Sequence, residues 1–191
     1  KPTASGSTIE QDGSTILTVD GSGNLSTPNT FTSTGAITGT GGIYLGGTAS
    51  ANLLDDYEEG SWTPVLTDDT NTFNGVGRYV KIKNLVWVNI IFQNPTAPLV
   101  GSASEIGVTG FPFIILSDSN YQPYVPFTPY NMKTGNTQNS TSGSWGMFVD
   151  GMGTKARLRW FRDNQVPINL KGSDLNTSTS IRIQFSYLVG L

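Results

Sequence analysis

The feature that most constrains this chain is a large apolar residue at every sixth position of a polar N-terminal stretch. These residues are Val19, Leu25, Phe31, Ile37 and Ile43. Six residues are three strand periods and no multiple of the helical period, so the five side chains would share one side of an extended chain. One apolar residue per repeat does not offset about 1–2 kcal/mol of backbone entropy for each ordered residue. We therefore expect residues 1–52 to form an intertwined β-structured shaft of three copies, a homotrimer. Composition alone also fits a disordered Gly/Ser/Thr linker, but the regular spacing favours the shaft.

The residue types present exclude several classes of function. The chain has no Cys and no His, so it lacks thiol nucleophiles, disulfides, imidazole bases and the usual zinc and haem ligands. We expect no cofactor. Nine of the acidic residues but only one basic residue precede Arg78, and the later cations are scattered, which argues against nucleic-acid binding. The longest apolar run, residues 85–92, is too short to span a bilayer, so we expect no membrane insertion.

From Trp62 onward, short runs of alternating apolar and polar residues are separated by turn residues, which is typical of an all-β domain. The expected strands are 62–66, a hairpin over 78–92, 105–108, 112–116, 145–149, 155–161, 166–170 and 180–189. Their number and length predict an antiparallel β-sandwich head, jelly-roll-like, over residues 65–191. Its expected core includes Trp87, Ile90, Phe148, Trp160, Ile183 and Phe185.

Residues 54–64 read Leu-Asp-Asp-Tyr-Glu-Glu-Gly-Ser-Trp-Thr-Pro. This closely resembles a segment that recurs in bacteriophage tail fibres and tailspikes, usually with Thr where this chain has Ser61. Residues 77–88 are similar to the hairpin that often follows that segment, with Lys83 in place of the usual Gly, so we expect the positive φ angle at Asn84. The resemblance implies a virion protein at the distal end of a tail fibre, a homotrimer that touches the host surface, and further shaft upstream.

Residues 53–64 form the expected junction, or collar, between shaft and head. Leu54 and Tyr57 would pack at the trimer axis while four nearby carboxylates point outward. Calcium binding is an alternative role, but the collar lacks the full ligand spacing of a calcium loop. Residues 20–24 begin like such a loop, yet Phe31 occupies the place of its closing Glu. We therefore expect no metal site.

The first candidate binding segment has an aromatic residue at every third position with prolines between. These aromatic residues are Tyr121, Tyr124, Phe127 and Tyr130. Polyproline II has three residues per turn, so the four rings would line one edge of a stiff rod. Aromatic faces bind the apolar faces of sugar rings, which makes this a candidate receptor contact. The alternative is that the rings attach a loop to the head or to a neighbouring subunit.

The second candidate is the cationic row Lys155, Arg157 and Arg159, which alternation places on one face of a strand. Such a row needs anions beside it. An acidic capsular sugar or a lipopolysaccharide phosphate would serve, and Arg binds either in a bidentate way. Acidic residues of an adjacent protomer would serve as well.

The carboxylates of the head lie mostly in turn-like surroundings, without the paired spacing that glycoside hydrolysis needs. We therefore expect a binding protein with no catalytic residues. The function expected from the resemblance and the candidate residues is attachment of a virion to a host cell-surface glycan, either capsule or lipopolysaccharide. Two alternatives stay open: a trimerisation knob that binds nothing, and a part of a capsule-degrading tailspike.

Overall fold

The computed structural model describes residues 6–28, 30–116, 124–133, 143–149, 155–162 and 166–190. Its contacts divide the chain into two compact units, one ending at Gly41 and the other beginning at Gly42. The sequence predicted a boundary after residue 52. The two boundaries differ because the short strand Ile43–Tyr44 (β4) pairs antiparallel with Leu53–Leu54 (β5), across the 3-10 turn Ser50–Asn52.

The first unit contains a small antiparallel sheet. Ser7–Gln11 (β1) and Ser14–Val19 (β2) form a hairpin, and Leu25–Ser26 (β3) pairs with the end of β2. Both residues of the Asp12-Gly13 turn have positive φ angles, 53° and 75°, as a type I′ hairpin turn requires. The side chains of Leu25, Phe31 and Ile37 are each more than half exposed. The trimeric shaft that would cover them stays a prediction.

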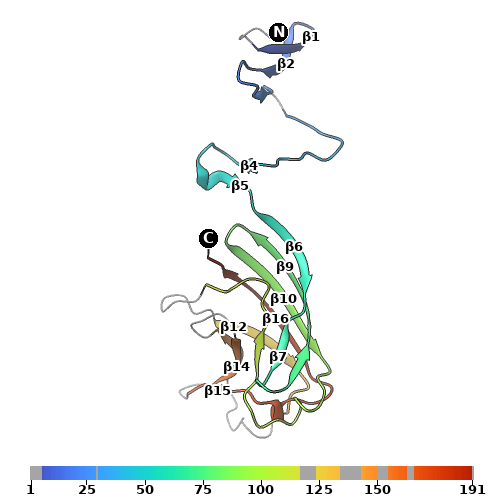
Figure 1. Ribbon diagram of the computed structural model, residues 1–191, viewed down its shortest axis with the longest axis vertical. Helices are drawn as coiled ribbons and strands as arrows, with labels where there is room; N and C mark the ends of the chain where they lie inside the picture. The colour runs from blue at the N-terminus through green and yellow to red at the C-terminus, as the bar shows by residue number, and fades with distance from the viewer. Residues whose placement is uncertain are drawn as a thin grey trace. The chain divides into compact units, whose positions relative to one another are not determined.

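The second unit contains a large antiparallel sheet, which confirms the all-β class (Figure 1). Its strands are Tyr57–Trp62 (β6), Val65–Thr67 (β7), Thr72–Asn74 (β8), Val76–Ile82 (β9), Leu85–Gln93 (β10), Gly107–Thr109 (β11), Tyr124–Tyr130 (β12), Gly143–Val149 (β13), Lys155–Arg162 (β14), Ile168–Asn169 (β15) and Ser180–Leu188 (β16). Across the sheet their order is β6-β9-β10-β16-β12-β13-β14-β11-β7-β8, and β15 pairs with β14. The predicted collar therefore contributes β6 to this sheet, paired with β9 along its whole length.

Strand β12 joins the two halves of the curled sheet. Its first three residues pair with β13, and the residues from Phe127 to Tyr130 pair with β16. The prediction of a polyproline II rod for this segment is therefore wrong over residues 124–130. The two backbone conformations are close in φ and ψ, and the hydrogen-bonding partners on both sides select the strand. Because a strand alternates, Val125 and Phe127 point to one face, while Tyr124 and Tyr130 point to the other.

The predicted hairpin is present as β9 and β10, joined by a two-residue turn in which Ile82 pairs with Leu85. The positive φ angle, 52°, is at Lys83 and not at Asn84 as predicted. Lys83 is the first central residue of the turn, the position at which Gly is favoured in type II′ turns. Lys83 therefore adopts a backbone conformation that glycine accepts more readily.

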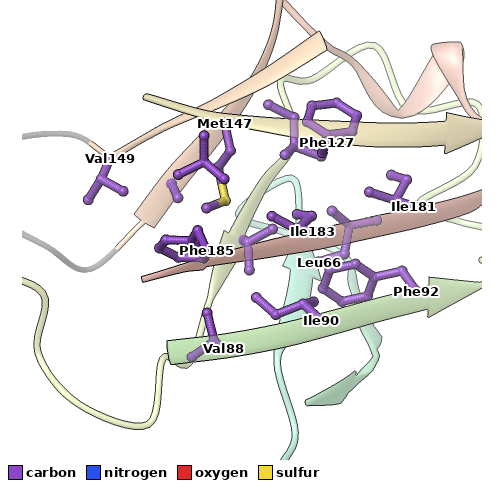
Figure 2. Close-up of a cluster of buried hydrophobic side chains, with 14 of the residues drawn as sticks. Leu66, Val88, Ile90, Phe92, Phe127, Met147, Val149, Ile181, Ile183 and Phe185 are labelled. Carbon is purple, nitrogen blue, oxygen red and sulfur yellow. The ribbon is translucent and has the colours of Figure 1, made fainter. Parts of the chain in front are cut away.

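The hydrophobic core lies on the inner face of the curled sheet, between its two halves. Figure 2 shows side chains from β10, β16, β12, β13 and β7 pointing toward one another. The predicted burial of Ile90, Trp160, Ile183 and Phe185 is confirmed. Phe148 is only half-buried.

The predicted burial of Trp87 is wrong, because 38% of this residue is exposed. Strand β10 places its even-numbered residues, such as Val86 and Ile90, in the core. Trp87 therefore points to the outer face, together with Asn89 and Gln93, whose polar side chains mark that side of the strand.

Candidate ligand-binding face

The two candidate groups that the sequence suggested meet on the outer face of β12, β13 and β14. Tyr124 is the cross-strand partner of Phe148, and Phe148 is the partner of Arg157. Arg159 and Phe161 follow on the same face of β14, because a strand alternates. These five residues, Tyr124, Phe148, Arg157, Arg159 and Phe161, are named here the aromatic–arginine face.

Tyr124 is held against the sheet by contacts on two sides. Its ring centroid lies 4.4 Å from that of Phe161, at an interplanar angle of 72°, and its hydroxyl shares a hydrogen bond of 3.0 Å with the Ser144 hydroxyl. A Cβ atom on Gly146 would lie 2.1 Å from the Tyr124 ring, so the ring covers this glycine closely. The residue is still 44% exposed. The result is a fixed ring with part of its surface open to solvent.

Arg159 is positioned beside this ring, since it is the cross-strand partner of Gly146. Its Cζ atom lies 4.6 Å from the ring centroid of Phe148, a cation–π contact. Its Nε donates a hydrogen bond of 2.7 Å to the Asn169 side-chain oxygen. Within the described ranges Arg159 has no acidic partner. It is therefore a pre-oriented cation whose charge no protein carboxylate neutralises there.

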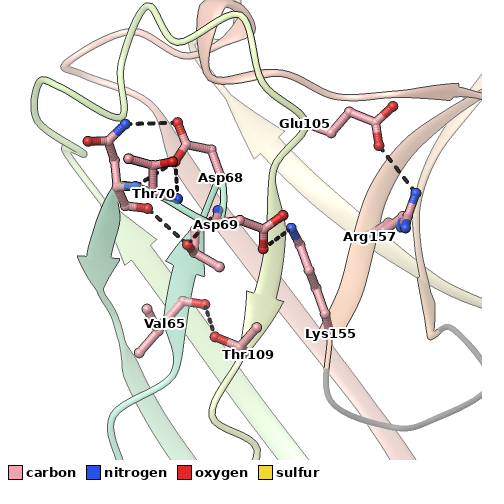
Figure 3. Close-up of polar contacts among 10 residues, drawn as sticks. Val65, Asp68, Asp69, Thr70, Glu105, Thr109, Lys155 and Arg157 are labelled. Carbon is pink, nitrogen blue, oxygen red and sulfur yellow. Dashed lines mark hydrogen bonds and ion pairs between the residues drawn. The ribbon is translucent and has the colours of Figure 1, made fainter.

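The other two cations of the row have acidic partners in the same chain (Figure 3). Lys155 Nζ lies 2.7 Å from an Asp69 carboxylate oxygen, and Arg157 Nη1 lies 3.3 Å from a Glu105 carboxylate oxygen. The sequence left open whether a ligand or a neighbouring protomer supplies the anions for this row. For these two residues the chain itself supplies one each, which leaves Arg159 as the member best placed for an anionic ligand.

The loop that presents Asp69 is held by its neighbour Asp68, which is buried. One Asp68 oxygen accepts hydrogen bonds from the backbone N–H groups of Thr70 (3.0 Å) and Asn71 (2.6 Å), and the other accepts one from the Asn71 side-chain amide (3.0 Å). The pKa of Asp68 lies well below its usual range, first because of the Ser102 hydroxyl and then because of these Asn71 donors. The Asp-Asp-Thr-Asn sequence is typical of a turn. The interaction of Asp68 with Ser102 could not be predicted locally, because the two residues are 34 positions apart.

The remaining predicted binding residues are placed elsewhere. Phe127 is only 7% exposed, so its side chain belongs to the core and does not form a ligand contact. Tyr130 is 67% exposed on the outer face, at the far end of β12 from Tyr124. Tyr121 lies outside the described residues. Of the two collar residues expected at a trimer axis, Leu54 is half-buried beside Ile43, and Tyr57 is exposed with its hydroxyl 3.0 Å from a Glu59 oxygen.

The sequence prediction missed Phe148 and Phe161 as members of this face. Phe161 was visible in the alternation, since it has the same parity along its strand as the cationic row. Phe148 was instead predicted to lie in the core, although the polar residue Ser144 has the same parity on its strand. Ser144 and Asn169, which hold Tyr124 and Arg159 in place, had no local signal. Their roles follow from strand pairing between segments far apart in the sequence.

In the described ranges no set of three or more acidic side chains is close enough to hold a metal ion. No helix in the described part of the chain has the length and hydrophobicity that crossing a bilayer requires. The sequence matches no protein-family model and no curated protein. The functional argument therefore depends on this face and on the tail-fibre-like segment.

Proposed function

We propose that this chain is part of a bacteriophage tail fibre that attaches the virion to its host by binding a surface polysaccharide. The observation that carries the proposal is that one sheet face holds an open, fixed Tyr124 ring together with the Arg159 guanidinium, which has no acidic partner among the described residues. The tail-fibre-like segment supports the assignment to a virion. In this proposal three chains associate through the side chains spaced by six residues, with Leu54 and Tyr57, and the curled sheet forms a sandwich-like head.

The chemistry of the face fits an acidic sugar polymer. The exposed part of the Tyr124 ring offers a flat surface for the apolar face of a sugar, and Arg159 offers paired donors for a uronate carboxylate or a phosphate. Three copies in one fibre raise the avidity, so a weak single site is compatible with firm adsorption.

The test is binding of the full chain to an array of bacterial capsular and lipopolysaccharide oligosaccharides. We expect Tyr124→Ala to weaken binding about tenfold at any salt concentration, because stacking is not screened. Arg159→Ala should weaken binding to acidic glycans only, and most strongly at low salt. Arg182→Ala is the control, because it removes an exposed arginine that has no acidic partner among the described residues and that lies on β16, in the other half of the sheet.

Retained binding by both folded variants, Tyr124→Ala and Arg159→Ala, would show that the receptor contact is not on this face. Sizing the polysaccharide after incubation separates binding from cleavage. We expect its length to be unchanged.

A further inference from the structure

The outer face of the other half of the sheet carries an apolar patch close to the collar. Cross-strand pairing places Tyr57, Ile82 and Leu85 in one row across β6, β9 and β10, and Val80 and Trp87 in the next. These five residues are named here the β6–β9–β10 patch. Tyr57 is 58% exposed, Ile82 and Leu85 are each 45% exposed, and Trp87 is 38% exposed.

This patch does not follow the usual pattern of a half-buried antiparallel sheet, whose outer face is polar. Further along the same strands the outer face does become polar, with Arg78, Asn89 and Gln184 aligned across β9, β10 and β16. This polar row separates the apolar residues near the collar from a second apolar pair, Val76 and Ile91, farther along the same strands. A contiguous exposed patch of large apolar side chains, rimmed by polar ones, marks a surface that another molecule covers.

We propose that the β6–β9–β10 patch is the surface through which the heads of identical chains pack against one another. The proposal rests on the multimer proposed above and not on its glycan ligand. It identifies the part of the head that would lie at the contact between copies.

The charges at the border of the patch favour a second copy of this chain as the occupant. A hollow of about 550 Å³ is lined by Glu59, Arg78 and Trp87, among others. Neither Glu59 nor Arg78 forms an ion pair within the described residues. Contacts in a threefold assembly are heterologous, so Glu59 of one copy can pair with Arg78 of the next. In addition, β6 is an edge strand of the sheet, an element that proteins usually cover.

Packing through this patch is compatible with ligand binding. The aromatic–arginine face is built from β12, β13 and β14, and none of these strands contributes to the patch. Heads that meet through β6, β9 and β10 therefore leave Tyr124 and Arg159 of each copy accessible to a polysaccharide.

The absence of cysteine from the chain allows a direct test with single cysteines in the full chain. Leu85→Cys lies in the patch, and Tyr124→Cys is the matched control, because the two residues are 45% and 44% exposed in the single chain. Each variant is first reduced and then desalted to remove the reductant. Its rate of labelling with a maleimide is then measured, and its mass is determined by light scattering. We expect Leu85→Cys to react at least tenfold more slowly than Tyr124→Cys in the native protein, and both to react equally fast in urea.

Ile82→Cys, in the same row, should show the same protection, and it replaces Leu85→Cys if that variant does not assemble. A trimeric mass with equal labelling rates would overturn the assignment of the patch but leave the trimer and the glycan site intact. A monomeric mass with equal rates would overturn the trimer as well. Protection that appears only when polysaccharide is added to a monomer would show that the patch binds glycan and would overturn the inference.

Discussion

Replacing Asp68 by Asn should destabilise the head far more than a single surface substitution normally does. The folded structure surrounds this buried carboxylate with donors from Thr70, Asn71 and Ser102. An Asn side chain keeps one acceptor oxygen for the backbone N–H groups, but it turns an amide toward the Asn71 amide and loses the charge. Hydrogen bonds to a charged group contribute about 1.5–3 kcal/mol each, so we expect a loss of about 2–3 kcal/mol in the free energy of unfolding at pH 7.

The loss should depend on pH in one direction. Because folding lowers the pKa of Asp68, the contribution of its charge is fully present above the unfolded-state pKa of about 3.9. It is lost as the pH falls below that value toward the lower folded-state pKa. The difference in stability between the original chain and Asp68→Asn should therefore be smaller at pH 3 than at pH 7.

The assay is urea unfolding followed by tryptophan fluorescence, at one fixed protein concentration because association shifts apparent stability. Asp69→Asn is the matched control. Its side chain is 75% exposed and pairs with Lys155, and an exposed ion pair contributes less than about 1 kcal/mol. Asn also tolerates the positive φ angle of 74° at this position. Equal losses for the two variants, or a difference that does not change with pH, would refute the reasoning.

Two further predictions concern single backbone positions. Gly146→Ala places a Cβ atom where the Tyr124 ring lies, so it should reduce glycan binding about as much as Tyr124→Ala does. The circular dichroism spectrum should remain that of a β protein. Unchanged binding would contradict the assigned role of the ring. Lys83→Gly removes a non-glycine residue from a positive φ angle. It should raise the free energy of unfolding, measured by urea unfolding, by about 0.5–1 kcal/mol. A lower stability would show that the contacts of the lysine side chain contribute more than the backbone strain costs.

The strands that local alternation could reveal were predicted well. The hairpin of β9 and β10, strand β14 and strand β16 all follow a period of two, with the turn residues between them. Strand β12 was misread because prolines favour φ angles that polyproline II and β-strands both accept. Only the pairing with β13 and β16, which the local sequence does not encode, distinguishes them.

The composition of the candidate site could be predicted in part. The cations of β14 and the aromatic residues of β12 were identified as two separate candidates. That Tyr124 lies beside Arg159, 35 positions later, depends on strand β13 lying between them with Gly146 under the ring. The outward position of Trp87 had a signal in Asn89 and Gln93, but apolar residues on both faces of β10 concealed it.

Strand β6 has a mechanical consequence for a head tethered through its N-terminal side. The chain enters the large sheet at Tyr57 and runs antiparallel to β9 through six consecutive cross-strand pairs. A pull on the chain ahead of Tyr57, directed along the strand, acts on these pairs together and does not peel them apart one after another. Sliding β6 along β9 would also break the edge-to-face contact of Trp62 with the Tyr79 ring and the packing of Trp62 against Gly77. In the proposed fibre, this segment would therefore hold the head against a force directed along the strand.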